Sequence, residues 1–134
     1  CVRLAEQLTI QPLTDTRLQE YDFGEWEMML WDEIRGPAAA QWFADYVHTP
    51  APQGESYVQM AERVVAFWEE ILMSEEAPPE RPLVVVTHAG VIRALLAHLL
   101  QMPLRQAFNL TIDLGGVTQL TVRETHIQVD YINR

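Results

Sequence analysis

The stretch PLVVVTHAGVIRALLAHLL, from Pro82 to Leu100, changes its hydrophobic period in the middle, and this change constrains the fold more than any other feature. Residues 83–86 form a continuous apolar run, which is typical of a strand buried on both faces of a sheet. Apolar residues then recur at helical spacing as far as Leu100. A buried strand followed directly by an amphipathic helix predicts an α/β fold with parallel strands in the middle of its sheet.

Two further segments complete the expected α/β sandwich. Apolar residues from Tyr57 to Leu72 fall on one stripe and predict a long amphipathic helix, and Ser56 with Gln59 forms a capping-box pattern at its start. The tail from residue 109 alternates polar and apolar residues and predicts strands with tight connections. The sheet is therefore expected to be mixed, parallel in the middle and antiparallel near the C-terminal strands.

The other segments give shorter signals. They are a helix over 2–8, a short strand over 12–18, two helical pieces within 25–47 that break at Gly36-Pro37, and a polar, Pro-rich linker over 74–82.

Composition limits the classes of function. The 134 residues, 49% of them hydrophobic, suffice for one domain over 1–134. A formal net charge of −10 argues against binding to nucleic acid or to an anionic membrane. The single cysteine, Cys1, excludes an internal disulfide and a cysteine-based zinc site, and it favours a reducing compartment, so we expect a cytoplasmic protein. All nine basic residues are arginines, whose forked donors suit phosphate or carboxylate.

The residues at the predicted strand-to-helix corner are the first candidates for chemistry. Thr87, His88 and Ala89 lie where ligands bind in open α/β sheets, and free backbone N–H groups there favour an anion. Gly90 would let a ligand approach the backbone closely. His88 could donate to a phosphate, attack it, hold a metal, or only cap the helix. The other histidines show no two-ligand spacing with it and are assigned to ordinary positions: His48, His98 and His126.

A run of carboxylates is the second candidate. Burial of several like charges is costly, so most of the run should face solvent. Glu20 precedes the corner YDFG, where partial burial would suit its carboxyl to general acid work. A fully solvated acidic loop is the alternative. The five carboxylates are Glu20, Asp22, Glu25, Glu27 and Asp32.

Three motifs in order, LQEYDFGEWE, PQGES and VVVTHAGVIRALL, resemble the histidine phosphatase superfamily and, within it, most closely the α-ribazole phosphatases of cobalamin biosynthesis. This resemblance implies a phosphoglycerate mutase-like, three-layer α/β/α sandwich with a mixed, mostly parallel sheet. It also implies a phosphatase that needs no cofactor or metal, forms a phosphohistidine intermediate and acts on a small phosphorylated metabolite, with α-ribazole 5′-phosphate as the expected substrate.

The resemblance also implies roles for residues. In such enzymes an Arg-His-Gly motif supplies the nucleophilic histidine, a second histidine and two arginines bind the phosphate, and a glutamate protonates the departing oxygen. The glutamate matches Glu20 and the second histidine matches His88. The backbone N–H groups of Ala89 and Gly90 are expected to be further phosphate donors.

The chain departs from the family pattern at its start. It contains no Arg-His-Gly, and the second phosphate arginine would immediately precede Cys1. No arginine present can be assigned to replace them, although Arg93 is the nearest candidate beside Arg3, Arg17 and Arg63. We therefore expect an N-terminally incomplete domain that lacks its first strand and part of its first helix. The exposed sheet edge is expected to be covered by a missing N-terminal segment or by a second chain.

Three alternatives remain at this point. A phosphoglycerate mutase or a broad-specificity phosphatase would share the same motifs. A non-catalytic remnant that acts as a binding module would account for the absent nucleophile. An acidic α/β domain of another role has the least support.

Overall fold

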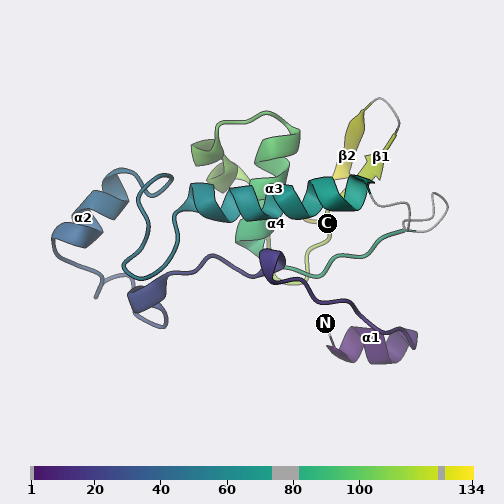
Figure 1. Cartoon of the computed structure of the whole chain (residues 1–134), viewed down its shortest axis with the longest axis horizontal. Helices are drawn as coiled ribbons and strands as arrows, with labels where there is room; N and C mark the ends of the chain where they lie inside the picture. The colour runs from purple at the N-terminus through teal and green to yellow at the C-terminus, as the bar shows by residue number, and fades with distance from the viewer. Residues whose placement is uncertain (1, 74–81, 124–125) are drawn as a thin grey trace.

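The computed structural model describes residues 2–73, 82–123 and 126–134 (Figure 1). Two long helices lie at its centre, and shorter elements surround them. In chain order the elements are α1 (Val2–Leu8), η1 (Thr16–Leu18), η2 (Gly24–Trp26), α2 (Pro37–Ala44), α3 (Tyr57–Met73), α4 (Ala89–Leu99), η3 (Leu104–Asn109), β1 (Gln119–Val122) and β2 (Ile127–Tyr131), where η denotes a 3-10 helix.

The core lies between α3 and α4. The residues of α3 that become buried recur at helical spacing, as the apolar stripe predicted. Small side chains of α4 face them and let the two helices approach closely, while η1 packs on α3 and η3 packs on α4. In Figure 1, α3 crosses in front of α4. The buried residues of the two helices in this core are Tyr57, Met60, Val64, Val91, Ala94 and Ala97.

The predicted helix starts are confirmed. Ser56 N donates to Gln59 Oε1 at 2.8 Å, and Gln59 N donates to Ser56 Oγ at 3.3 Å, so the capping box forms at the start of α3. Helix α2 begins at Pro37, directly after Gly36 with φ 97°. The break at Gly36-Pro37 therefore lies where the sequence predicted it.

Two of the short elements differ from expectation. The first helical piece expected within 25–47 is replaced by η2 and turns, because the backbone leaves the right-handed helical region at Met28, with φ 62°. The strand expected over 12–18 is also wrong. There Asp15 accepts from Arg17 N and starts η1.

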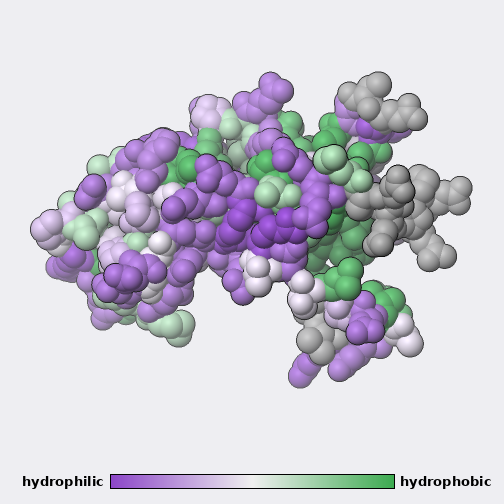
Figure 2. Space-filling model, in the orientation of Figure 1, coloured by the Kyte–Doolittle hydropathy of each residue, from purple (hydrophilic) through white to green (hydrophobic). Residues whose placement is uncertain are grey.

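The strand expected at 83–86 is not formed. These residues precede α4 and form no strand hydrogen bonds with any part of the chain that the structure describes, and they are between 41% and 65% exposed. A strand requires a neighbour for its N–H and C=O groups, and the described residues provide none here. The expected parallel centre of the sheet is therefore absent from the part of the chain that the structure describes. On the face in Figure 2, hydrophobic surface gathers toward the right of the molecule.

The antiparallel part of the expectation is confirmed near the C-terminus. Strands β1 and β2 pair antiparallel, with Leu120 opposite Val129 and a register irregularity after Gln119. The tail's first run, 109–113, forms no strand: η3 continues to Asn109, and residues 111–113 have no regular secondary structure. The linker expected over 74–82 lies, except for Pro82, outside the described residues. No helix in the described ranges is long and apolar enough to cross a membrane.

Candidate functional site

His88 lies at the start of α4, as the sequence predicted. Its backbone is extended, with φ −117° and ψ 163°, and its carbonyl accepts from Ile92 N at 3.0 Å. The imidazole is exposed and makes no capping hydrogen bond. The alternative in which the side chain of His88 only caps the helix is therefore not what the structure contains.

The segment before α4 is tied to the first part of the chain. Thr87 Oγ1 donates to the carbonyl of Leu18 at 2.8 Å, across 69 residues of sequence. This bond joins the end of the 82–88 segment to η1. The residues that follow η1 therefore lie against the N-terminus of α4.

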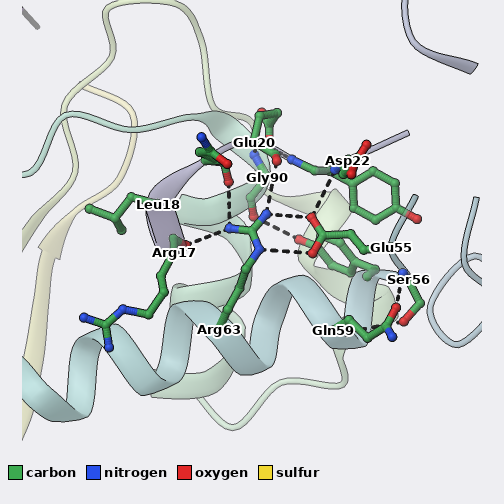
Figure 3. Close-up of polar contacts among 12 residues, drawn as sticks. Arg17, Leu18, Glu20, Asp22, Glu55, Ser56, Gln59, Arg63 and Gly90 are labelled. Atoms are coloured by element: carbon green, nitrogen blue, oxygen red, sulfur yellow. Dashed lines mark hydrogen bonds and ion pairs between the residues drawn. The ribbon is translucent and has the colours of Figure 1, made fainter. Parts of the chain in front are cut away.

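Glu20 reaches this N-terminus with its carboxylate (Figure 3). Its Oε2 accepts from Gly90 N at 3.3 Å, and its Oε1 accepts from Tyr21 N at 3.0 Å. A Cβ at position 90 would clash with Glu20 Oε1, so glycine is what permits this approach. The structure thus brings together Glu20 and the 88–90 corner, which the sequence had identified as separate candidates.

The other carboxylates of the acidic run behave as expected. Glu20 is half-buried, whereas the remaining four are exposed to solvent, in agreement with the cost of burying like charges together. The exposed members are Asp22, Glu25, Glu27 and Asp32. The single exception therefore lies at the corner where the sequence predicted it.

The amides expected to bind phosphate are used differently in this structure. The amide of Gly90 already donates to Glu20, so an anion bound here would share or replace that bond. The amide of Ala89 is the first of α4 and donates to no group among the described residues. Both N–H groups lie at a helix N-terminus, where the backbone favours negative charge.

Arg63 of α3 binds the backbone that leads to Glu20. Its Nη1 donates to the carbonyls of Arg17 at 2.7 Å and Gln19 at 2.8 Å, and its Nη2 donates to the carbonyl of Glu20 at 3.1 Å. Nε and Nη2 bind the two carboxylate oxygens of Glu55 at 3.0 and 2.6 Å. All donors of the guanidinium are therefore occupied, and Arg63 is not a free phosphate ligand.

Glu55 connects Arg63 to a second loop. Its Oε1 also accepts from Asp22 N at 3.0 Å, and its backbone N donates to the Asp22 carbonyl at 3.0 Å. Gly24, with φ 54°, and Gly54 let the two loops pack backbone to backbone, because a Cβ at either would overlap the opposite chain. Residues 17–24 and 51–56 are thus held as one unit against α3.

Two buried tyrosines complete the surroundings of the corner. Tyr57 donates its hydroxyl to the carbonyl of Gly90 at 3.2 Å, and Trp42 Nε1 donates to the Tyr21 hydroxyl at 3.2 Å. Burial raises the pKa of Tyr57 and, less strongly, that of Tyr21. Both phenols therefore act as neutral hydrogen-bonding groups near neutral pH.

The other arginines that were candidates from the sequence form contacts elsewhere in the chain. Arg93 is half-buried, donates to the Leu110 carbonyl at 2.9 Å and lies over the Phe108 ring. Arg17 pairs with Asp15 and Glu70, and Arg3 is exposed on α1. None of these contacts directs a guanidinium to the corner of His88.

Of the other histidines, His48 pairs with Asp45 at 2.8 Å, and His98 and His126 are exposed.

The Arg63–Glu55 pair could not be predicted from the sequence, because no local pattern shows which carbonyls an arginine will meet. The motif PQGES, which ends in Glu55 and Ser56, was the one signal that marked this region.

A model of the histidine phosphatase superfamily (branch 1) matches residues 1–134. The chain is 34% identical over 110 residues to the glucosyl-3-phosphoglycerate phosphatase of Mycobacterium tuberculosis, covering 76% of this chain and 49% of that protein. It is 26% identical over 130 residues to the adenosylcobalamin/alpha-ribazole phosphatase of Escherichia coli, covering 95% and 62%. The chain thus spans about half the length of the first relative and less than two thirds of the length of the second.

Solved structures share the arrangement. The alpha-ribazole phosphatase from Shigella flexneri superposes with a TM-score of 0.85 at 22% identity, over 98% of this chain and 65% of that one. The mycobacterial glucosyl-3-phosphoglycerate phosphatase in complex with inorganic phosphate gives 0.78 at 30% identity, over 99% and 70%. This similarity confirms the α/β fold class that the sequence predicted.

Proposed function

The chain belongs to the histidine phosphatase superfamily, and on that premise we propose that this chain carries the general acid and part of the phosphate-binding site of a phosphomonoesterase. The observation that supports the proposal is the bond between the Glu20 carboxylate and the Gly90 amide, which brings a carboxyl group and His88 to one helix N-terminus. Phosphoryl transfer depends mainly on positioning and charge stabilisation, and such a corner can provide both.

In the proposed reaction, a histidine nitrogen from outside residues 1–134 attacks phosphorus, and the ester P–O bond breaks as the N–P bond forms. Protonated Glu20 gives its proton to the leaving oxygen. Water then attacks the phosphohistidine and loses a proton to the Glu20 carboxylate, and the N–P bond breaks to release inorganic phosphate. His88 and the amides of Ala89 and Gly90 donate hydrogen bonds to the phosphoryl oxygens.

The nucleophile in this proposal comes from a strand that pairs with residues 83–86. The sequence contains no Arg-His-Gly, and the 83–86 run is apolar, exposed and continuous with His88. A strand added along this run would satisfy its backbone and would end beside the same corner. Either a further segment of the same protein or a second chain could supply it.

The proposed substrate is a small phosphorylated metabolite, with α-ribazole 5′-phosphate as first choice and cytoplasm as the expected location. Support comes from the motifs, from the Escherichia coli relative and from the Shigella flexneri structure. Glucosyl-3-phosphoglycerate has equal support from the mycobacterial relative. A mutase remains an alternative, because a phosphoglycerate mutase of Cytophaga hutchinsonii is 25% identical over 139 residues.

A panel of phosphate esters tests the proposal. The form of the protein that hydrolyses p-nitrophenyl phosphate is assayed with α-ribazole 5′-phosphate, glucosyl-3-phosphoglycerate and 3-phosphoglycerate, and products are followed so that isomerisation is separated from hydrolysis. We expect His88→Ala and Glu20→Gln each to lower kcat/KM for these three alkyl phosphates by about 100-fold. His98→Ala, on the same helix and exposed, is the matched control and should leave kcat/KM unchanged. Equal rates for His88→Ala and wild type would overturn the proposed site.

A second candidate, a ligand-binding module without catalysis, is favoured by one observation, the absence of Arg-His-Gly from the sequence. Calorimetry with inorganic phosphate separates it from the first. Phosphate binding that depends on His88, in a protein whose every form leaves p-nitrophenyl phosphate intact, would support the module. Hydrolysis that is lost in His88→Ala would exclude it.

A further inference from the structure

We infer that Arg63 and Glu55 are positioning residues for Glu20, and this inference rests on the proposed function for its catalytic consequence. Neither side chain touches the 88–90 corner itself. Both act through the backbone of residues 17–22, from which Glu20 reaches that corner. The proposal concerns where the general acid is held.

Arg63 uses its guanidinium mainly to bind main-chain carbonyls. Five hydrogen bonds leave it, three to main-chain carbonyls and two to Glu55. An arginine that served only charge balance would not need three carbonyls from one four-residue stretch. Its planar fork fixes the direction of each bond, which a lysine ammonium does not do. Arg63 therefore sets the path of residues 17–20 relative to α3 (Figure 3).

The ion pair of Arg63 and Glu55 is largely buried. The side chains of Arg63 and Glu55 are 22% and 17% exposed, so water competes only partly for their bonds. Glu55 holds the guanidinium by both oxygens and also accepts from Asp22 N, two residues beyond Glu20. The backbone is thus bound on both sides of Glu20, at its own carbonyl and at the amide of Asp22.

The backbone of residues 17–22 determines where the Glu20 carboxylate lies. Glu20 binds Gly90 N at 3.3 Å, a long bond that a small shift of the backbone would break. Misplacement of a catalytic group by about 1 Å costs on the order of 100-fold in rate. Loss of the Arg63 fork should therefore separate Glu20 from α4 while leaving the side chain intact.

A general acid matters most when the leaving group is poor, and this gives a readout that misfolding would not produce. An alkyl phosphate needs protonation of its departing oxygen, whereas p-nitrophenolate leaves readily without it. The parameter to compare is kcat/KM for the two esters, because it covers the steps through transfer to the nucleophile. General loss of folded protein would lower both values equally.

The experiment compares Arg63→Lys and Glu55→Gln with Glu20→Gln in the form of the protein that hydrolyses phosphate esters. We expect Arg63→Lys to lower kcat/KM about 100-fold for an alkyl phosphate and less than about 10-fold for p-nitrophenyl phosphate, with Glu55→Gln in the same direction. Arg105→Lys is the matched control, since Arg105 is an exposed arginine paired with Asp45 and should leave both values unchanged. Equal losses on the two esters in Arg63→Lys, beside a selective loss in Glu20→Gln, would overturn the positioning role alone.

A second measurement on the 134-residue chain needs no activity. The amides of Tyr21 and Gly90 both donate to Glu20, so Glu20→Gln should change the NMR shifts of both amides. In Arg63→Lys we expect the Gly90 amide to change its shift, because its bond to Glu20 is lost. If the Gly90 amide keeps its wild-type shift in Arg63→Lys, the inference is wrong. If Glu20→Gln shows no selectivity between the esters, the proposed acid role fails instead, independently of this result.

Discussion

The loops around Glu20 and the segment that leads to His88 meet at one corner, but they are stabilised very differently. Residues 17–24 and 51–56 are held by hydrogen bonds within the chain, through Arg63, Glu55 and backbone pairs. Residues 83–86 are at least as apolar, yet their side chains are exposed and their backbone has no strand partner among the described residues. The difference shows that a largely buried ion pair and local backbone bonds can hold loops in place, whereas a strand depends on another strand.

The largest expected effect comes from the helix that supports the loops. Met60 of α3 is fully buried and packs beside Gly90, so Met60→Ala should lower the free energy of unfolding by about 2–5 kcal/mol through lost contacts and a cavity. Urea unfolding followed by tryptophan fluorescence measures this. A loss below about 1 kcal/mol would mean that the core near the corner can collapse around the smaller side chain.

The next effect is a dependence on alkaline pH. Burial raises the pKa of Tyr57, so the folded state keeps the phenol proton more tightly than the unfolded chain does. Its stabilisation is complete below about pH 10 and is lost as the pH rises further, by up to about 1.4 kcal/mol per pH unit. Because the chain contains no lysine, tyrosines dominate this range.

The measurement is urea unfolding from pH 8 to pH 11 for wild type and Tyr57→Phe. We expect the variant to have a shallower decline in stability above about pH 10, because it removes one buried group whose proton is lost on unfolding. Tyr131→Phe, at the hairpin, is the comparison variant. Identical slopes in wild type and Tyr57→Phe would contradict the buried position of this phenol.

A smaller effect is expected where the loops enter α3. Ser56→Ala removes the oxygen that accepts from Gln59 N, and loss of such a cap costs about 1 kcal/mol of stability. Ser56→Thr keeps an acceptor and serves as the control. Thermal unfolding at neutral pH compares the three proteins. No difference between Ser56→Ala and wild type would show that the turn at 51–56 holds the start of the helix by itself.

The smallest effect on stability, and the sharpest test of the contrast, lies in the exposed run. Val84 is 65% exposed, so Val84→Lys should change the free energy of unfolding by less than about 0.5 kcal/mol. It should at the same time reduce association of the chain at high concentration, because charge on an open apolar edge blocks strand pairing. Sedimentation and urea unfolding of the same samples measure both. A large loss of stability would show that residues 83–86 are buried in solution, and the contrast would fail.

Parts of the fold with local causes were predictable. The stripe of α3, its capping box, the start of α2 at Pro37 and the helix after His88 each depend on residues within a few positions of one another, and all are present. The helix expected after Glu25 did not form, because the backbone leaves the helical region at Met28, with φ 62°. The spacing of the apolar residues did not indicate that turn.

The candidate site was predictable in its members but not in its geometry. Glu20 could be selected from the acidic run because it precedes an aromatic corner, and His88 because it lies at a change of period. That the two residues meet at Gly90 depends on a contact across 70 residues. Arg63 carried no signal at all, since its partners are main-chain carbonyls that any residue could provide.

The amino-acid sequence by itself determined the two central helices, the corner at residues 88–90, the antiparallel C-terminal strands and the family to which the chain belongs. Only the tertiary structure decided that Glu20 binds the Gly90 amide and that residues 83–86 lie exposed. It also decided that Arg63 binds the main-chain carbonyls that lead to Glu20. The physical reason is the range of the interactions. The backbone groups of a helix bond to residues four positions away, whereas a strand, or a side chain such as that of Arg63, needs partners that only packing brings near.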